Sequence, residues 1–300
     1  MQAYISKRCH KHIKKALVSS AFFFVANFLL FLFATPILAA NCTSPQLTPP
    51  EKATVKWVYD GDSLLLRDKR KIRIIGIDTP EVKHHQQKAQ AYGAKAREAL
   101  RELLKSHDYQ VYLRYGAERK DRYSRILAHV YLPDGTNISN WLLERGYAKT
   151  LAIPPNIKLA KCYQKDEEKA QQQSLKIWRY KKNQIKTVEK LSQRSSGYIR
   201  LEGTIKKIKR HKKSLVLEFK GNSKKRIRVK IQKKNLKYFK ALKFDKLINK
   251  TILVTGTLRK RYGKRTIYVN YPTQLKVLSN RRETKSTRGS NATLKWSIKK

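Results

Sequence analysis

Alternation of hydrophobic and polar residues is the main pattern of the chain from residue 54 onward. Successive side chains of a strand point to opposite faces, so this alternation predicts strands with one face in a core. In the first half of the chain, strands are expected at 54–58, 63–67, 71–76, 109–115 and 126–130.

Apolar residues also recur every three or four positions, the spacing that places side chains on one face of a helix. The clearest run is Tyr92, Ala96, Leu100 and Leu103. Gly146 suits the end of a later helix, because glycine readily adopts the left-handed conformation there. Helices are expected at 88–106, 139–145 and 157–176. Five strands with three helices in this order favour a closed barrel of the oligonucleotide/oligosaccharide-binding (OB) kind.

The alternation stops over 179–196 and resumes over 197–280. The first of these stretches is rich in Lys, Gln and Ser, so a linker is expected there. The second predicts five strands with a helix near 235–244, which suits a second OB-like barrel. The expected fold is α+β, mainly β, with domains at 54–178 and 197–280, a lead-in at 41–53 and a basic disordered tail at 281–300.

The first 40 residues have the pattern of a targeting segment. Five basic residues precede an apolar run from Ala16 to Ala40, and the first acidic residue of the chain is Glu51. We expect a signal peptide cleaved after Ala40, export to the periplasm or the medium, and no stable membrane insertion afterwards. The alternative is an N-terminal membrane anchor, because the apolar run is long enough to span a bilayer.

Export changes the interpretation of the three cysteines. Cys9 would leave with the signal peptide, and Cys42 and Cys162 would enter an oxidising compartment. One disulfide between them is then expected, with two unpaired thiols as the alternative. Neither cysteine has the spacing of a metal site.

Basic residues greatly outnumber acidic ones, with 69 Lys and Arg against 21 Asp and Glu and a formal net charge of +48. Such a surplus attracts polyanions to the surface. Nucleic acid is the leading partner, and an anionic membrane or cell-envelope polymer is the alternative. Because 40% of the residues are hydrophobic, the chain is more than a disordered basic tail.

Four of the 21 acidic residues lie in two neighbouring segments, Tyr59-Asp60-Gly61-Asp62-Ser63 and Ile77-Asp78-Thr79-Pro80-Glu81. Each segment by itself is typical of a hairpin turn or a helix cap. Together they flank predicted strands, so their carboxylates converge if those strands are neighbours. Carboxylate and carbonyl oxygens suit a hard divalent cation, which polarises a phosphate and helps hold an attacking water.

Two arginines are candidates to balance the negative charge that develops on phosphorus during hydrolysis. Arg73 lies on a predicted strand between the two acidic segments, and Arg125 follows Asp121-Arg122-Tyr123-Ser124. A guanidinium can bind two phosphate oxygens at once. In a chain this basic, either arginine alone is an ordinary surface charge.

From about residue 53 to residue 178, the order of these motifs resembles the staphylococcal nuclease (thermonuclease) family. The motifs that carry the resemblance are the Asp-Gly-Asp-Ser turn, Arg73, Ile-Asp-Thr-Pro-Glu, Tyr92-Gly93, Asp121-Arg122-Tyr123-Ser124-Arg125, the helix over 142–146 and Ile177-Trp178.

The resemblance implies a Ca²⁺-dependent nuclease that cleaves the P–O5′ bond of DNA and RNA and leaves 3′-phosphates. It implies that Asp62 and Asp78 bind Ca²⁺ through carboxylates and that Thr79 contributes its backbone carbonyl. Asp60 would support the metal pocket.

The resemblance also implies roles in catalysis and substrate binding. Glu81 would act as general base toward the attacking water, and Arg73 and Arg125 would stabilise the phosphorane. Arg122 and Tyr123 would contact the neighbouring phosphate or sugar.

The chain departs from the family pattern at three places. Ser63 stands where Thr is usual and keeps a hydroxyl. Ser124 stands where Gly is usual, and a position that needs positive φ would put the placement of Arg125 in doubt. Residues 151–153 lack the tyrosines that stack on nucleotide in the reference member, so weaker nucleotide binding is expected there.

The second predicted barrel has no comparable group of acids, so no catalysis is assigned to it. Its strands repeatedly carry outward Lys and Arg, which suits binding to a nucleic-acid backbone, with a merely solvated basic face as the alternative. Nothing in the sequence calls for a partner protein or for more than a monomer. The competing function for the whole chain is a catalytically inactive nucleic-acid-binding protein on the same fold.

Overall fold

The structure is a computed structural model that describes residues 50–82, 89–221, 227–261 and 263–278. The predicted signal peptide, most of the lead-in and all of the basic tail lie outside these ranges. Among the helices that are described, none is both long enough and apolar enough to cross a membrane.

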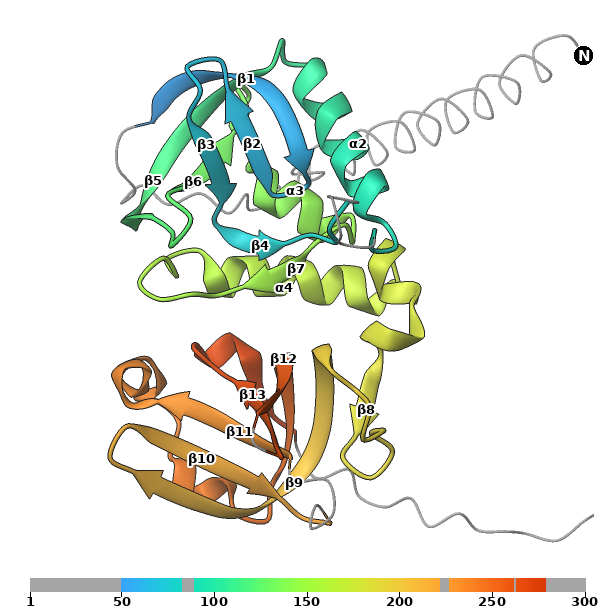
Figure 1. The fold of residues 1–300 in the computed structure, drawn as a ribbon, viewed down its shortest axis with the longest axis vertical. Coiled ribbons are helices and arrows are strands. Elements are labelled where there is room, and N and C mark those ends of the chain that lie inside the picture. The colour runs from blue at the N-terminus through green and yellow to red at the C-terminus, as the bar shows by residue number, and fades with distance from the viewer. Residues whose placement is uncertain (1–49, 83–88, 222–226, 262, 279–300) are drawn as a thin grey trace, which may run out of the picture. The chain divides into compact units, whose positions relative to one another are not determined.

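Five strands close into a first barrel (Figure 1). They are paired in the order β1-β2-β3-β6-β5, and β5 pairs with β1 to complete the closure. This arrangement confirms the predicted OB-like fold of the first domain. The strands are β1 (Glu51–Asp60), β2 (Ser63–Leu66), β3 (Lys71–Ile74), β5 (Gln110–Lys120) and β6 (Ile126–Tyr131).

The first barrel begins earlier than its sequence pattern predicts. Residues 51–53 were expected to belong to a lead-in, but they form the start of β1 and pair with β5. The prediction missed them because Glu51 and Lys52 are exposed, so they add no hydrophobic alternation. Their strand conformation comes from pairing with β5, which is a tertiary interaction.

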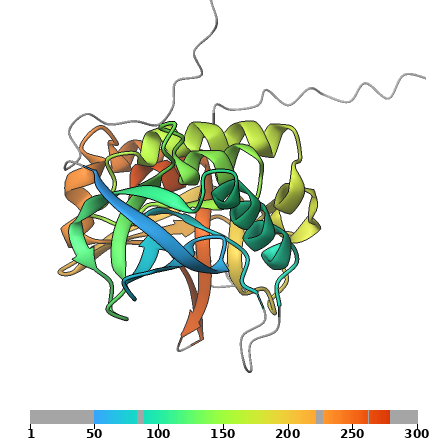
Figure 2. The same ribbon diagram turned by 90° about the horizontal axis from the view of Figure 1, so that it is seen from above.

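The three predicted helices are present in the first domain, and two are shorter than predicted. They are α2 (Gly93–Lys105), α3 (Ile138–Glu144) and α4 (Ala160–Gln172). Tyr92 has φ +70°, so α2 cannot extend before Gly93. Ser174 and Lys176 also have positive φ, which ends α4 ahead of the predicted residue 176. Figure 2 shows α2 beside the strands of the first barrel.

The predicted strand over 71–76 divides in two at Gly76, whose φ is +90°. Glycine permits this conformation and the close approach of Tyr163, since a Cβ at this position would lie 2.3 Å from its ring. The second part, β4 (Gly76–Asp78), pairs antiparallel with β7 (Lys149–Leu151). The sequence pattern did not predict β7, which is only three residues long.

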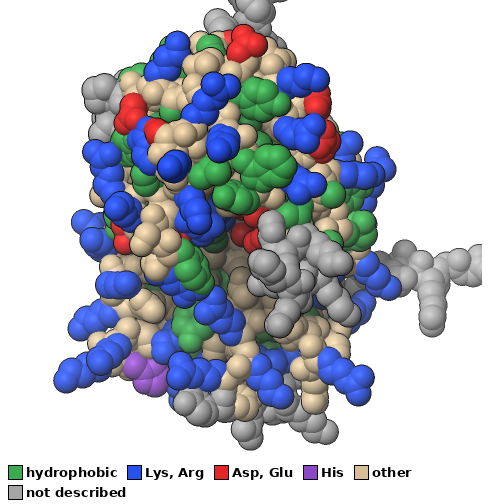
Figure 3. All heavy atoms as spheres, turned by 45° about the horizontal axis from the view of Figure 1, so that its top comes forward, with side chains coloured by type: hydrophobic (Ala, Val, Ile, Leu, Met, Phe, Trp, Pro, Cys, Tyr) green, Lys and Arg blue, Asp and Glu red, His purple; other side chains and the backbone are tan. Residues whose placement is uncertain are grey.

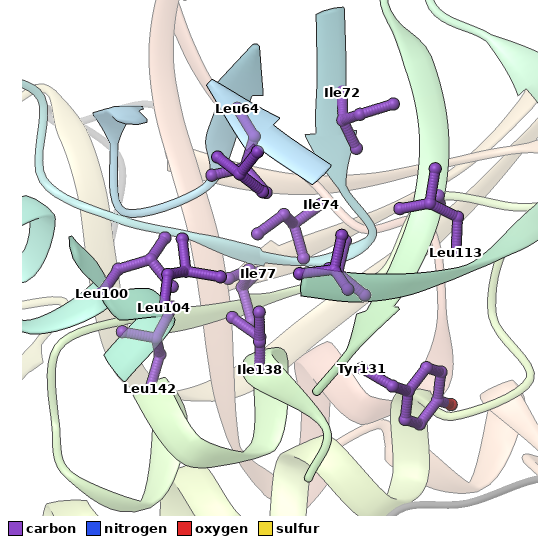
Figure 4. Close-up of a cluster of buried hydrophobic side chains, with 14 of the residues drawn as sticks. Leu64, Ile72, Ile74, Ile77, Leu100, Leu104, Leu113, Tyr131, Ile138 and Leu142 are labelled. Carbon is purple, nitrogen blue, oxygen red and sulfur yellow. The ribbon is translucent and has the colours of Figure 1, made fainter. Parts of the chain in front are cut away.

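A hydrophobic core fills the first barrel and the contacts of its helices (Figure 4). Strand residues such as Ile72 and Leu113 and helix residues such as Leu100 and Leu142 have no exposed surface. These are the apolar positions at period two and period three to four that predicted the elements. Burial of each such side chain contributes about 1.5–3 kcal/mol, so the core fixes the strands that carry the acidic turns.

Five further strands form the second barrel, which confirms the expected second OB-like domain. They are paired in the order β12-β13-β11-β10-β9, and β12 also pairs with β9. The pairing of β11 with β13 is parallel. The strands are β9 (Gly197–His211), β10 (Ser214–Phe219), β11 (Ile227–Gln232), β12 (Thr251–Arg261) and β13 (Lys264–Tyr268).

The helix expected near 235–244 takes a different form. The chain forms two 3₁₀ helices, Lys233–Phe239 and Phe244–Leu247. Leu236 packs against the core, and Phe239, three residues later, is 2% exposed. Apolar residues three apart suit the three-residue turn of a 3₁₀ helix better than a longer α-helical face.

The stretch 179–196 is more ordered than its linker-like composition predicts. It contains β8 (Ile185–Thr187), which pairs parallel with β9. Val188 and Leu191 are buried in the core of the second barrel. These few apolar residues are held by tertiary packing, and they are too few to form a periodic pattern in the sequence. A short strand, β14 (Leu275–Val277), pairs with β12 at the other end of this sheet.

Candidate active site

Asp62 lies at the centre of a hydrogen-bonded group of predicted site residues. Its Oδ2 accepts a hydrogen bond from the backbone N–H of Thr79 at 2.9 Å and lies 3.1 Å from Nη2 of Arg73. Its Oδ1 accepts a hydrogen bond from the hydroxyl of Ser63 at 3.0 Å. The Asp62 carboxylate is therefore held by groups from three segments, and the residue is only 4% exposed.

The turn that carries Asp62 is packed too closely for any residue but glycine at position 61. A Cβ on Gly61 would lie 2.7 Å from Cγ2 of Thr79. Asp60 accepts a hydrogen bond from the backbone N–H of Asp62 at 3.3 Å, and Ile74 donates its own N–H to the carbonyl of Asp62 at 2.9 Å. The predicted Asp-Gly-Asp turn and the predicted Asp-Thr segment thus pack against each other.

Arg73 reaches across the acidic group from β3. Its Nη1 donates to the carbonyl of Ile74 at 2.8 Å, and its Nη2 lies 3.7 Å from Oδ1 of Asp78 as well as close to Asp62. The Arg73 side chain is only 12% exposed. Pairing of β2 with β3 sets this geometry, since Ser63 and Arg73 are register partners.

Glu81 is positioned by the start of α2. Its backbone carbonyl accepts a hydrogen bond from the N–H of Gln90 at 2.9 Å. A Cβ at Gly93 would lie 2.4 Å from the same carbonyl oxygen, so glycine allows the helix to approach this closely. The Tyr92-Gly93 pair therefore determines where the Glu81 backbone lies.

Burial and mutual repulsion raise the pKa values of carboxylates in this site. Burial raises the pKa of Asp60 to about 7, with the negative charge of Asp62 as the second cause. Burial, then the charges of Asp62 and Asp78, raise the pKa of Glu81. Partial desolvation and Asp62 also raise the pKa of Asp78. The four carboxylates outnumber Arg73 and Lys149, the two cations whose charges act on Asp78.

Arg125 approaches the same turn from the loop before β6. Asp121 accepts hydrogen bonds from its backbone N–H at 3.0 Å and its Nε at 2.8 Å, and pairs with its Nη2 at 2.8 Å. The remaining Nη1 lies 3.4 Å from the hydroxyl of Ser63. Ser124 has φ +61°, so this position does need the conformation that favours glycine.

Tyr123 is 63% exposed and lies between two guanidinium groups. The guanidinium carbon of Arg122 is 4.7 Å from the centre of the ring, and that of Arg125 is 5.6 Å from it. Nη2 of Arg122 donates to the Tyr123 hydroxyl at 2.6 Å. An exposed aromatic ring with two cations suits contact with the sugars, bases or phosphates of a nucleic acid.

Among the described residues, no three His, Cys, Asp or Glu side chains are arranged to hold a metal ion. The predicted site needs fewer carboxylates, because it uses Asp62, Asp78 and a carbonyl of Thr79. One observation fits a cation there: Oγ1 of Thr79 is buried without a hydrogen-bond partner in the described part of the chain. The surrounding donors are all oxygen atoms, which suits a hard cation such as Ca²⁺.

Lys149 is a site residue that the sequence pattern missed. It is 8% exposed and is the register partner of Asp78 across β4 and β7. Burial lowers the pKa of Lys149, and the charge of Asp78 acts in the opposite direction. Nothing distinguishes this lysine from the many others in the sequence, because its position depends on the pairing of two three-residue strands.

Comparison with known proteins agrees with this geometry. The sequence model described as "Staphylococcal nuclease homologue" matches residues 71–180. The chain is 35% identical over 133 residues to the thermonuclease of Staphylococcus intermedius, which covers 43% of this chain and 76% of the relative. The chain belongs to the staphylococcal nuclease family. The family match contains Arg73, Asp78, Glu81 and Arg125, and begins after the Asp60–Asp62 turn.

Two Bacillus subtilis (strain 168) proteins show the same family likeness over a smaller share of their length. The chain is 35% identical over 126 residues to the SPbeta prophage-derived endonuclease YokF and 34% identical over 126 residues to endonuclease YncB. These matches cover 42% of this chain, but only 40% and 56% of the two relatives. Family membership is thus established for the first domain and says nothing of residues beyond about 180.

Proposed function

We propose that this protein is an exported, Ca²⁺-dependent nuclease that hydrolyses phosphodiester bonds of DNA and RNA. One observation carries the proposal: Arg73 and Arg125 approach the turn at 60–63 from two different segments, beside Asp78 and Glu81. The high positive charge of the chain supports a polyanionic substrate.

The two arginines would bind the scissile phosphate from different directions. Arg73 is held by Asp62 and the carbonyl of Ile74, and Arg125 is held by Asp121. These contacts orient both guanidiniums before substrate arrives, so less rotational entropy is lost when they bind a phosphate. Both would stabilise the extra negative charge of the phosphorane.

Glu81 would accept a proton from the water that attacks phosphorus. The water oxygen would form a bond to phosphorus while the P–O5′ bond breaks; the leaving O5′ would take up a proton from solvent, which gives a 3′-phosphate and a 5′-hydroxyl. Burial and neighbouring carboxylates raise the pKa of Glu81, and a base with a pKa closer to neutral accepts a proton more readily. Asp60, beside it, would support the carboxylate arrangement.

The carboxylates of Asp62 and Asp78, with the backbone carbonyl of Thr79, would hold Ca²⁺. The ion would polarise the phosphate and offset the repulsion among the carboxylates. Two observations support a cation here: within the described residues Oγ1 of Thr79 has no hydrogen-bond partner, and burial followed by the charge of Asp62 raises the pKa of Asp78. Arg122 and Tyr123, at the surface, would contact an adjacent nucleotide.

Export is supported by the apolar segment that follows basic residues in 1–40 and by the disulfide-bonded state of Cys162. Disulfides persist mainly in oxidising compartments. The pairing of Cys162 with Cys42 stays a prediction, since Cys42 lies outside the described residues. Mass spectrometry of protein from the culture medium and the periplasm would show whether the chain begins at Asn41.

Digestion of single-stranded DNA and RNA by residues 41–300 tests the catalytic proposal. Cleavage should require Ca²⁺, stop with a chelator, and fall by at least 100-fold in Glu81→Gln and in Arg125→Ala, which is the scale for losing a catalytic group. Glu98→Gln and Arg101→Ala, at an exposed pair on α2, are matched controls that should cleave normally. End-labelling of the products would identify 3′-phosphates.

The competing function is a nucleic-acid-binding protein without catalysis. In that case, the loss of catalysis would arise from Ser124, which has a left-handed conformation and directly precedes Arg125. Salt-sensitive binding with no cleavage at any Ca²⁺ concentration would favour this function and reject the nuclease. Recovery of cleavage in Ser124→Gly would then identify the cause.

A further inference from the structure

The second barrel has a basic groove on its outer surface, well separated in sequence from the nuclease motifs. The groove encloses about 720 Å³ and is lined by residues of β9, β10, β11 and the start of β13. Its described lining includes five basic residues and one acidic residue, with His211 in addition. The charged residues are Lys206, Lys207, Lys209, Arg228, Lys264 and Glu218.

Strand register places these charges in a row across the sheet. Lys207 on β9 is the register partner of Glu218 on β10, which in turn is the partner of Arg228 on β11. Arg228 is the partner of Thr266 on β13 and donates to its hydroxyl at 3.0 Å. Side chains of register partners point to the same face, so this row lies on the outside of the barrel, opposite the buried core.

A second row repeats the arrangement two residues further along. Lys209 on β9 is opposite Val216 on β10, and Val216 is opposite Lys230 on β11. Lys209 also pairs with Glu218 of the first row at 2.7 Å. The basic side chains flank Val216, which is 2% exposed, whereas Phe219 packs in the core of the barrel. Spacing along a strand puts successive same-face residues about 7 Å apart.

The position of the groove matches the part of this fold that is suited to a linear ligand. The barrel has the OB order, and its second and third strands, β10 and β11, carry the groove. Lys264 lies at the hairpin between β12 and β13 and adds a positive charge from another segment. OB barrels bind oligonucleotides over the second and third strands, bordered by such hairpins.

We propose that this groove is a second nucleic-acid site, which binds the phosphates of a single strand independently of the catalytic barrel. Lys207, Lys209, Arg228 and Lys264 would contact the phosphates of the backbone. The proposal goes beyond nuclease activity, since it concerns binding by a domain that the family match does not include.

A single strand fits these observations better than a duplex. The positive charges lie on both sides of a concave surface, so an extended chain can enter and be contacted from two sides. A duplex is a wide convex rod, and it would meet only the rim. Glu218 in the middle of the groove lowers affinity for a bare polyanion, and it pairs with Lys209 when the groove is empty.

Equilibrium binding of a fluorescent 20-residue oligothymidylate tests the proposal. The full exported chain carries Glu81→Gln and is kept with a chelator, so the result does not depend on whether the protein cleaves. The double variant Lys207→Gln/Lys264→Gln, at two exposed positions, should weaken binding by roughly tenfold at low salt. It should also reduce the slope of log affinity against log salt by about 1.4, because each phosphate contact on a single strand contributes about 0.7.

The matched control is Lys246→Gln/Lys250→Gln, which removes the same charge from exposed residues of the same barrel outside the groove. It should change the salt slope by less than about 0.3. Equal losses in the two double variants would overturn the proposal in favour of unspecific attraction by net charge. Loss of duplex or heparin binding, with unchanged binding of the oligothymidylate, would also overturn it.

Neutralising Glu218 provides a second test, in which affinity for the oligothymidylate should rise rather than fall. Glu218→Gln should tighten oligothymidylate binding by about threefold to tenfold, because it removes a repulsive charge and releases Lys209. Asp245→Asn makes the same change in charge at an exposed ion pair with Arg210, away from the groove. Equal tightening in both variants would contradict a localised site.

Discussion

Arg125 and Ser63 meet across 3.4 Å, with Nη1 of the arginine donating to the serine hydroxyl, although 62 residues separate them. The same hydroxyl donates to Oδ1 of Asp62. The Ser63 hydroxyl therefore links a candidate phosphate-binding arginine to a candidate metal-binding carboxylate by two hydrogen bonds. Ser63 replaces the Thr that is usual in the family pattern, and it keeps the one group that this connection needs.

Removing that hydroxyl should lower catalysis without preventing folding. Ser63→Ala loses hydrogen bonds to Arg125 and Asp62, each contributing about 0.5–1.5 kcal/mol. We expect kcat/KM for single-stranded DNA to fall by about threefold to tenfold. Ser63→Thr keeps the hydroxyl and should retain most of the activity. Equal kinetics for all three proteins would mean that the contact does not position Arg125.

Ser124 should be a strained position. With φ +61°, an L-residue costs about 1–2 kcal/mol relative to glycine, part of which is offset by the greater entropy of glycine in the unfolded chain. Ser124→Gly should therefore raise the free energy of unfolding in urea by about 0.5–1 kcal/mol. Ser124→Val should lower it, because β-branched residues disfavour this conformation. The reverse order would show that the turn is not strained.

Gly93→Ala should destabilise the protein, although alanine generally favours a helix more than glycine does. Alanine in a free helix is about 1 kcal/mol more stable than glycine. At position 93 the new Cβ would lie 2.4 Å from the carbonyl oxygen of Glu81, so the start of α2 or Glu81 must move. We expect lower stability and a fall in kcat, measured by urea unfolding and cleavage kinetics. Ala94→Gly, at the exposed neighbour, is the control for propensity alone.

His129 should make the protein less stable in acid. It is 2% exposed, Tyr163 contacts its Nδ1 at 2.9 Å, and burial lowers its pKa from 6.5 to about 4. The unfolded chain then binds more protons between these values, so stability from this group is complete above pH 6.5 and lost as pH falls to about 4. The change is on the order of 3 kcal/mol.

The variant His129→Gln isolates this effect, because it keeps polar atoms near Tyr163 but does not titrate. Its free energy of unfolding should depend less on pH between 4 and 6.5 than that of the parent. Burial raises the pKa of Asp166 to about 6, which acts in the opposite direction, so the two proteins must be compared at each pH. Parallel pH curves would contradict the assignment to His129.

Calcium should stabilise the folded protein through Asp78 and its neighbours. A ligand present at 100 times its dissociation constant adds about 2.7 kcal/mol to the free energy of unfolding. Asp78→Asn should abolish this gain. Without calcium the same variant should be as stable as the parent or more stable, since burial, and then the charge of Asp62, raises the pKa of Asp78. Thermal unfolding with Ca²⁺ and with a chelator measures both effects.

The strands and helices with complete hydrophobic faces were predictable from the sequence. Period-two alternation located β5, β6, β10 and β11, and helical spacing located α2, because each buries a continuous row of apolar side chains. Elements that lack such a row were missed. These are β7 and β8, and the 3₁₀ form of the segment after β11, whose conformations depend on pairing or packing with distant residues.

Which residues could form the site was largely determined by the sequence. The order of the acidic turns, Arg73 and the Asp121–Arg125 segment indicates phosphodiester chemistry, because carboxylates suit a divalent cation and arginines suit a phosphate. Their convergence on one turn does not follow from the sequence. A strand pattern does not state which strand is its neighbour.

Only the tertiary structure determines the distances between the site residues and the pKa values of their side chains. Pairing of β2 with β3 places Ser63 beside Arg73, and the loop before β6 brings Arg125 to the same hydroxyl. Pairing of β4 with β7 buries Lys149 beside Asp78. Sequence specifies the side chains and the period of their burial. Desolvation and proximity, which set pKa values and hydrogen bonds, arise only when distant segments pack together.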